Sequence, residues 1–486
     1  MTATAVRHPA AGPGLFAPGL RGLTIGMVAL VSLLAFEALA VATAMPTVAR
    51  DLDGLSLYAL AFGGPFASGV LAMVLAGSWC DARGPVAPTA HGVLWFVAGL
   101  LVAGTAPSMP VLAAGRIVQG FGSGMLSVAL YVLVGRAYPE ALLRRVFAAF
   151  AGAWVVPSLV GPAVAGLTVQ YLGWRWVFLA VPVLAVPAVL LIRPALRTSS
   201  PTPAGPDRPA GTAVGPDRPV GARAGERRSV RGPGSTTAGA RRRIGWAVGA
   251  ATGAALLHIG GQQRGATAVV LLAVAAGALL TCVPRLLPAG FARARRGLPA
   301  VIAVRGLTAA AFAGSEVFLP LVLSRERGLP PAGAGLALAV GALSWSAGSA
   351  LQGRLARPGA GPRTALPRLG LLSMVIGIGT VSLLLVGVPV PVGVLGWGLT
   401  GFGIGIVYPI LSALTLTLSE RADQGRNSAA LQLADSIFSA TVLAVAGALL
   451  AATADPGPAT YLAGFGVTGA VAVAALLLAG RLRPAA

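Results

Sequence analysis

The hydrophobic positions of this chain form long uninterrupted runs, without the short alternating patterns of half-buried strands. A helix needs about 20 apolar residues to cross the hydrocarbon of a bilayer. Six runs near this length precede a polar stretch at residues 194–243, and eight follow it. The expected spans are 22–48, 57–79, 89–108, 110–135, 146–171, 174–193, 244–261, 266–287, 299–323, 332–354, 366–388, 391–418, 428–452 and 459–480. The pattern predicts an all-α membrane protein with fourteen transmembrane helices.

The placement of charge agrees with this prediction. Only 10% of the 486 residues are charged, whereas soluble domains carry about 25%. All 36 basic residues are arginine, and a cytoplasmic N-terminus places 29 of them in cytoplasmic segments, as the positive-inside rule requires. The net charge of +22 is therefore a topology signal, with both termini cytoplasmic, and no nucleic-acid partner is expected. Twelve spans would keep the same alternation if the pair at 244–287 failed to insert.

Two parts of the chain repeat one pattern. "QGFGSG" at 119–124 matches "TGFGIG" at 400–405, and Pro46 matches Pro320 at a nearly equal offset. These glycines lie inside apolar runs, where small residues let helices pack closely. Parallel repeats are typical of transporters whose substrate site lies between two halves. The expected organisation is an N-terminal six-helix half at 1–197, a cytoplasmic disordered linker at 198–243, an inserted helix pair at 244–288 and a C-terminal six-helix half at 289–486.

Several kinds of enzyme and metal chemistry lack the residues they need. A P-loop requires lysine, and the chain has none. Cys80, Cys282 and the three histidines show no metal-ligand spacing, and no nucleophile–base pair is evident. We therefore expect no enzyme activity, no cofactor and no metal.

One acid, Glu37, lies inside the first apolar run. Burying a charge in a bilayer costs several kcal/mol, so an intramembrane acid is a functional candidate by default. The helical rise places Glu37 about 16 Å, and Arg116 of the fourth run about 9 Å, from the outer helix ends. An arginine side chain could therefore reach the carboxylate. The pair is either a site that loads and releases a proton or a structural ion pair between two helices.

Two further acids lie in later runs. Glu316 is about 10 Å from the outer end of its helix, where it could be a second proton site or a group that recognises cations. It could equally be an interfacial residue held by Arg325 or Arg327. Asp435 is about 10 Å from the inner face, and it either faces a cavity or serves helix packing. We expect the substrate cavity to include Gln119, Gln432 and Asp435.

Two other polar residues receive structural interpretations. Arg305, near the inner end of its helix, can extend its charge toward the interface and is expected to be structural. His258, close to an outer helix end, is expected to be an ordinary interfacial histidine. Neither residue is therefore assigned to transport.

Three motifs resemble those of one transporter family. Glu37 precedes Pro46 by nine residues, in a pattern similar to L-D-x-T-I-V-N-V-A-L-P. "RIVQGFG" at 116–122 carries the full R-x-x-Q-G-x-G pattern, and "GPAVAG" at 161–166 matches G-P-x-x-G-G except at Ala165. With these motifs the chain resembles the major facilitator superfamily, specifically its 14-helix drug:proton antiporters. The resemblance covers most of the chain outside the linker and implies a major-facilitator-type fold.

The loop after the second span departs from the family's pattern. It reads "GSWCDARGPV", where the family has G-x-x-x-D-R-x-G-R-[KR]. Gly77, Asp81 and Gly84 are kept, while Arg83 lies one position late and the basic residues that follow are missing. In the family this loop forms an inner charge latch, so the resemblance implies a conformational gate at these four residues.

The fifth span carries the residues of the family's antiporter motif. Pro157 and Pro162 remove backbone hydrogen bonds and allow bends, while Gly161 and Gly166 allow a neighbouring helix to approach. The resemblance implies that this motif seals the cavity against leak. A simple kink is the alternative.

These features together favour a proton-coupled exporter of the cytoplasmic membrane that works by alternating access. Its partners would be protons, the lipid bilayer and a lipophilic or cationic drug-like molecule, and the protein is expected to be monomeric. Glu37, Arg116 and Glu316 are the expected proton-coupling residues. The alternatives are a proton-coupled uptake symporter and a membrane sensor or scaffold that transports nothing.

Overall fold

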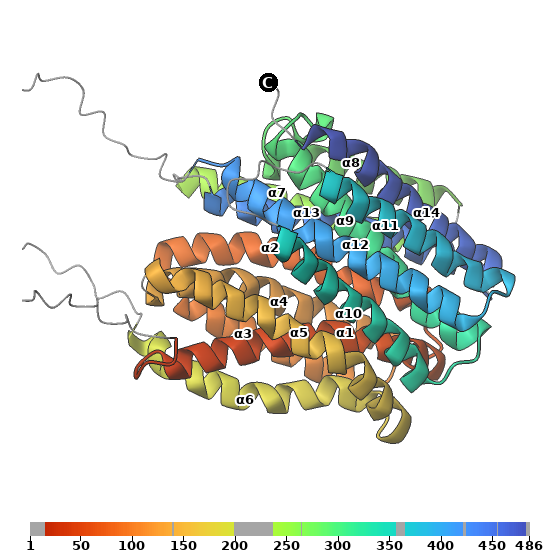
Figure 1. Ribbon diagram of the computed structural model, residues 1–486, viewed down its shortest axis with the longest axis horizontal. Helices are drawn as coiled ribbons and strands as arrows, with labels where there is room; N and C mark the ends of the chain where they lie inside the picture. The colour runs from red at the N-terminus through yellow and green to blue at the C-terminus, as the bar shows by residue number, and fades with distance from the viewer. Residues whose placement is uncertain are drawn as a thin grey trace, which may run out of the picture.

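The computed structural model describes residues 15–138, 140–198, 237–263, 265–355, 365–420, 424–453 and 455–482, and these ranges contain fourteen α-helices that form one bundle (Figure 1). The helices are α1 (Arg21–Asp51), α2 (Tyr58–Arg83), α3 (Val86–Gly104), α4 (Met109–Ala137), α5 (Glu140–Tyr171), α6 (Arg175–Thr198), α7 (Thr237–Gly260), α8 (Gly265–Leu286), α9 (Leu298–Leu321), α10 (Pro331–Leu355), α11 (Ala365–Ser382), α12 (Val390–Thr417), α13 (Gln424–Ala451) and α14 (Pro458–Leu478). Each expected span coincides with one of these helices. The predicted linker lies mainly outside the described residues, but its last residues, 237–243, form the first turns of α7.

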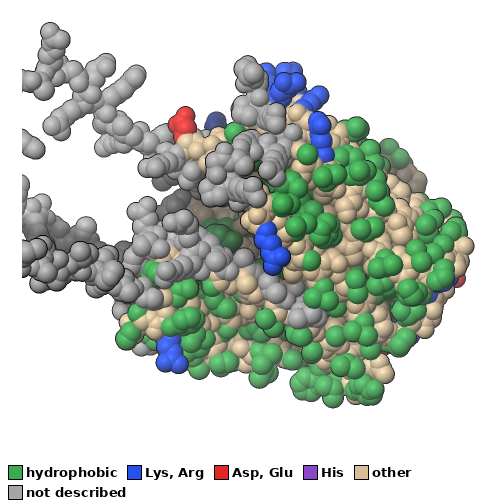
Figure 2. Space-filling view, viewed as in Figure 1, with side chains coloured by type: hydrophobic (Ala, Val, Ile, Leu, Met, Phe, Trp, Pro, Cys, Tyr) green, Lys and Arg blue, Asp and Glu red, His purple; other side chains and the backbone are tan. Residues whose placement is uncertain are grey.

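Most of these helices are suited to a bilayer. Among the described residues, twelve helices are long and apolar enough to cross a membrane. The other two, α5 and α7, are equally long, and α7 carries three consecutive arginines at 241–243, in its first two turns. Figure 2 shows many hydrophobic side chains and few charged ones on the described part of the visible face, as expected of a surface that contacts lipid.

The two halves of the bundle repeat the same helix contacts. In the first half α1 packs on α5 and α6, α2 on α4, and α3 on α4 and α6. In the second half α9, α10 and α11 make the equivalent contacts with α12, α13 and α14. The all-α fold with two parallel six-helix repeats and an inserted pair is therefore confirmed.

The repeated glycine motif explains how these helices come so close. In α4, Gly120 and Gly124 face the backbone of α2, while Gly122 faces the backbone of α3. In α12, three glycines repeat this alternation, with two facing α10 and one facing α11. A side chain at any of these positions would collide with a neighbouring backbone, so the sequence interpretation of close helix packing is confirmed.

The core is divided differently at the two ends of the bundle. We call the end where α6 stops at Thr198 and α7 starts at Thr237 the linker end, and the other the opposite end. At the opposite end one hydrophobic cluster joins both halves, including Met45 and Tyr58 of the first and Phe318 and Leu443 of the second. At the linker end the clusters are separate: one comprises only first-half residues, and the other is built mainly from the second half and the inserted pair.

Direct contacts tie the halves together at the opposite end. The Tyr58 hydroxyl of α2 donates to the Val317 carbonyl of α9 at 3.2 Å. A β-carbon at Gly447 of α13 would lie 3.2 Å from Ala59 of α2. In this arrangement the halves are joined at the opposite end.

The inserted pair packs at the seam between the halves. Helix α7 contacts both α2 and α13, and α8 packs on α7. His258 of α7 is only 2% exposed, and its ring lies against Gly63 of α2. The expectation of an interfacial histidine is therefore wrong, because α7 lies between two core helices and its histidine faces them. Its Nδ1 pairs with the Ala254 carbonyl at 3.0 Å, and its Nε2 is buried without a partner among the described residues.

Candidate functional site

A buried ion pair joins three helices of the first half. Arg116 of α4 donates to the carboxylate of Glu37 in α1 and to the side-chain oxygen of Gln119, and its Nε donates to the Ala61 carbonyl of α2 at 3.1 Å. Glu37 is 4% exposed, Arg116 5% and Gln119 2%. The structure thus brings together the acid and the arginine that were predicted to be within reach.

The stability of this ion pair depends on both of its charges. Charge-assisted hydrogen bonds are about twice as strong as neutral ones, and a buried charge that loses its partner is strongly unfavourable. Protonation of Glu37 would therefore leave the Arg116 guanidinium with only neutral acceptors. A change in the protonation of Glu37 would alter how firmly α1 is held to α2 and α4.

The second half carries a different group at the equivalent place. By the repeat offset, Arg116 corresponds to Trp397 of α12, whose ring stacks on Phe312 of α9 at 4.9 Å with an interplanar angle of 28°. The Trp397 indole donates to the Leu338 carbonyl of α10 at 3.4 Å, much as Arg116 donates to Ala61. By the same repeat, Phe312 lies within one residue of the position equivalent to Glu37. Leu338 lies within one residue of the position equivalent to Ala61. An aromatic stack therefore replaces the ion pair.

Aromatic rings continue from this stack through the second half. Phe312 also meets Trp345 of α10 edge to face at 5.2 Å, and Trp345 meets Tyr408 of α12 at 5.3 Å. Phe312, Trp345 and Tyr408 are only partly buried. We call Phe312, Trp345, Trp397 and Tyr408 the aromatic cluster. Sequence reasoning missed it, because the rings come from three helices and no linear motif connects them.

Glu316 lies one helical turn from this cluster. It follows Phe312 by four residues on α9, and side chains with that spacing share a helix face. Glu316 is partly buried, and it has no ion-pair or hydrogen-bond partner among the residues that the structure describes. Arg325, one of its possible interfacial partners, instead pairs with Asp455 at 3.2 Å. Glu316 is therefore a carboxylate without a partner among the described residues, one helical turn from the aromatic cluster.

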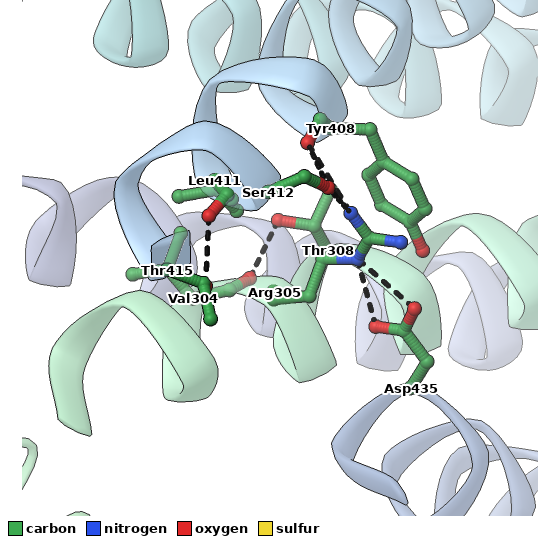
Figure 3. A network of polar contacts seen from close by, with 8 residues as sticks. All are labelled: Val304, Arg305, Thr308, Tyr408, Leu411, Ser412, Thr415 and Asp435. Carbon is green, nitrogen blue, oxygen red and sulfur yellow. Dashed lines mark hydrogen bonds and ion pairs between the residues drawn. The ribbon is translucent and has the colours of Figure 1, made fainter. Parts of the chain in front are cut away.

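A second ion pair lies toward the linker end of the second half (Figure 3). Arg305 of α9 donates from Nε to both carboxylate oxygens of Asp435 in α13, at 3.1 and 2.9 Å. Its Nη1 donates to the Ser412 hydroxyl at 3.1 Å and to the Tyr408 carbonyl at 3.2 Å, and its guanidinium lies 3.4 Å from the Tyr408 ring centroid. The expectation that Arg305 extends toward the interface is wrong, because Asp435 and Tyr408 hold its charge inside the bundle.

The predicted substrate-cavity residues come from both halves of the bundle. Gln119 belongs to the buried pair of the first half and Asp435 to the ion pair of the second. Gln432 lies three residues before Asp435 on α13 and is exposed. The structure therefore separates the three residues between two halves, and their role as a cavity lining stays a prediction.

The predicted gate surrounds the end of α2. This helix ends at Gly84, whose φ of 84° favours glycine, and Arg136 of α4 donates to the Cys80 carbonyl of the last turn at 3.0 Å. Arg83 is exposed, Gly77 has open space around its α-carbon, and the Asp81 side chain lies outside the described residues. Sequence reasoning missed Arg136, which is 56 residues away from the carbonyl that it binds.

The antiporter-motif residues of α5 lie at a contact between the halves. Pro157, Gly161, Pro162 and Gly166 are all buried. A β-carbon on Gly166 would lie 2.7 Å from the α-carbon of Ala332 in α10, and one on Gly335 of α10 would collide with the Pro162 carbonyl. The glycines therefore allow backbone-to-backbone approach of α5 and α10, which is more than a local kink.

Part of the chain is similar to known multidrug-efflux transporters. A probable multidrug-efflux transporter of Mycobacterium tuberculosis is 30% identical over 191 residues, which cover 39% of this chain and 40% of that protein. The multidrug efflux pump SdrM of Staphylococcus aureus is 25% identical over 168 residues, 35% of this chain and 38% of that protein. The chain thus matches about two fifths of the length of these curated relatives.

Solved structures show the same fold at low sequence identity. A POT family transporter in complex with 5-aminolevulinic acid aligns with a TM-score of 0.64 and 14% identity, covering 96% of this chain and 98% of that one. A peptide transporter POT in complex with sulfate gives a TM-score of 0.62 at 17% identity, covering 96% of each chain. The family model of the Major Facilitator Superfamily matches residues 25–400. This multi-pass membrane protein is a member of the Major Facilitator Superfamily.

Proposed function

We propose that this protein exports lipophilic cations across the cytoplasmic membrane in exchange for protons. The observation that carries the proposal is the unpaired Glu316 beside the aromatic cluster. Aromatic faces attract cations by about 0.5–2 kcal/mol each, more when water is excluded. An organic cation with apolar substituents suits such a site better than a neutral or strongly hydrated solute.

Proton coupling is assigned to Glu37 and Arg116. The pair is buried, it links α1 to α2 and α4, and its strength depends on whether Glu37 is ionised. Glu316 is the second acid that could exchange a proton for the substrate. Competition between one cation and one proton for the same carboxylate is the simplest form of antiport.

Alternating access is supported by how the halves meet. With both termini cytoplasmic, as the arginine bias favours, the described arrangement is closed toward the outside and has separate cores toward the cytoplasm. Release outside would then require the contact between α5 and α10 to open. We expect the transporter to act as a monomer, with all fourteen helices in the membrane.

Proton release from reconstituted vesicles tests the proposal. Lipophilic cations and neutral compounds of similar size are added to wild type, Glu37→Gln and Glu316→Gln, with Asp455→Asn as a control for an exposed acid. We expect cation-triggered proton movement in wild type and the control, and its loss in the other two variants. Proton movement that is equal for neutral compounds would refute cation selection, and full activity of Glu37→Gln would refute its assigned role.

A further inference from the structure

A recess with three arginines lies at the linker end of the inserted pair. It has a volume of about 280 Å³ and is lined by Arg242, Arg243 and Trp246 of α7 and by Arg285 of α8. The arginines in the recess are exposed, and Trp246 is half-buried. The site is separate from the ion pairs and the aromatic cluster described above.

The positive charge in this recess has no counter-charge within the part of the chain that the structure describes. None of Arg242, Arg243 and Arg285 forms an ion pair with any residue that the structure describes. The guanidinium of Arg285 lies 4.6 Å from the Trp246 ring centroid and donates to the Thr281 carbonyl. These contacts hold the Arg285 side chain at the wall of the recess. Three guanidinium groups that line one recess favour an anionic ligand.

The surroundings of the recess fit a lipid. Val269, Val270, Val274 and Leu280 of α8 are 67%, 59%, 52% and 76% exposed, so α8 presents an apolar face along its length. Acyl chains can lie along that face while the headgroup reaches the arginines at the helix end. Tryptophan is enriched at the same level of a bilayer, and basic pockets between transmembrane helices on the cytoplasmic side bind anionic headgroups.

We propose that this recess binds the phosphate of an anionic phospholipid. Guanidinium groups form paired hydrogen bonds with phosphate oxygens, and Arg242, Arg243 and Arg285 supply them from two helices. The bound lipid bridges the start of α7 and the end of α8. Because α7 also packs on α2 and α13, the lipid holds the pair at the seam between the halves.

The test measures binding of phosphatidylglycerol and phosphatidylcholine to the purified full-length protein in detergent at fixed low salt. The triple variant Arg242→Gln/Arg243→Gln/Arg285→Gln is compared with Arg193→Gln/Arg354→Gln/Arg368→Gln, which removes three exposed arginines elsewhere at the linker end. An arginine close to a bound anionic headgroup contributes about 1 kcal/mol to its binding, and only the first variant removes the arginines of the recess, so it should bind phosphatidylglycerol about 100-fold more weakly. The control should bind within about 3-fold of wild type.

Other outcomes would overturn the proposal. Equal losses in the two triple variants would mean that lipid binding follows total charge and not this recess. Inorganic phosphate that displaces phosphatidylglycerol at equal concentration would identify a small-anion site. If the triple variant does not fold, Arg285→Gln alone should weaken binding about 5-fold, and unchanged binding there would refute the site.

Discussion

The contact between α5 and α10 allows a quantitative prediction about alternating access. In Gly166→Ala, the new methyl group would lie 2.7 Å from the α-carbon of Ala332 and 2.8 Å from the carbonyl oxygen of Pro331, and neither backbone atom can rotate away. Overpacking of this kind costs about 1–3 kcal/mol. The cost applies only while the opposite end is closed, so the closed population should fall about 5- to 140-fold relative to the open one.

Spin labels can measure this shift. Leu172 and Val386 lie at the opposite end on different halves and are 67% and 70% exposed, so cysteine at both positions accepts labels without disturbing the core. Cys80 and Cys282 are buried and would be replaced in the background. The distance distribution should move to longer values in Gly166→Ala.

A control on the same helix makes the result decisive. Gly152 of α5 is exposed, and a β-carbon there meets no atom within 4 Å. Gly152→Ala should keep the wild-type distances. If Gly166→Ala gave the same distribution as Gly152→Ala, the close approach of α5 and α10 would not hold the opposite end closed, and the reasoning would be wrong.

Three further predictions concern polar groups inside the bundle. Arg116→Gln leaves Glu37 buried without its cation, so it should lower the free energy of unfolding by about 3–5 kcal/mol. Denaturation in detergent measures this loss. A loss below about 1 kcal/mol would show that the pair is not buried. Glu316→Gln should change the free energy of unfolding by less than about 0.5 kcal/mol, because no described partner is lost. Binding of a lipophilic cation, measured by titration, should weaken at least about 5-fold. His258→Leu removes an unpaired buried nitrogen and should be neutral or stabilising by about 1–3 kcal/mol in thermal unfolding; clear destabilisation would indicate an undetected partner such as a bound water.

The positions of the helices could be predicted from the sequence because the bilayer requires a certain length and an apolar composition of each span. The repeat could be predicted from "QGFGSG" and "TGFGIG", because a side chain at these glycines would collide with the backbone of a neighbouring helix. Helical rise predicted similar depths for Glu37 and Arg116, and hence that the arginine could reach the acid. Such features depend on one helix or on depth in the membrane, and these are properties of the linear chain.

Features that depend on how helices are arranged around one another could not be predicted. His258 was expected at an interface, and only the packing of α7 between α2 and α13 shows that it is buried. The same holds for the stacking of Phe312 on Trp397, which joins residues 85 positions apart. Hydrophobic periodicity gives the buried face of a helix but not which helix covers it.

The replacement of the Arg116–Glu37 pair by the Trp397–Phe312 stack makes the duplicated halves chemically unequal. A chain built from two copies of the first half would carry two buried ion pairs at these positions. A chain built from two copies of the second half would carry none there. The two matching six-helix frames therefore hold different side-chain chemistry at corresponding positions. The fold is symmetric in shape, whereas at this level of the bundle a buried charge pair lies on one side of the pseudo-axis and an aromatic stack on the other.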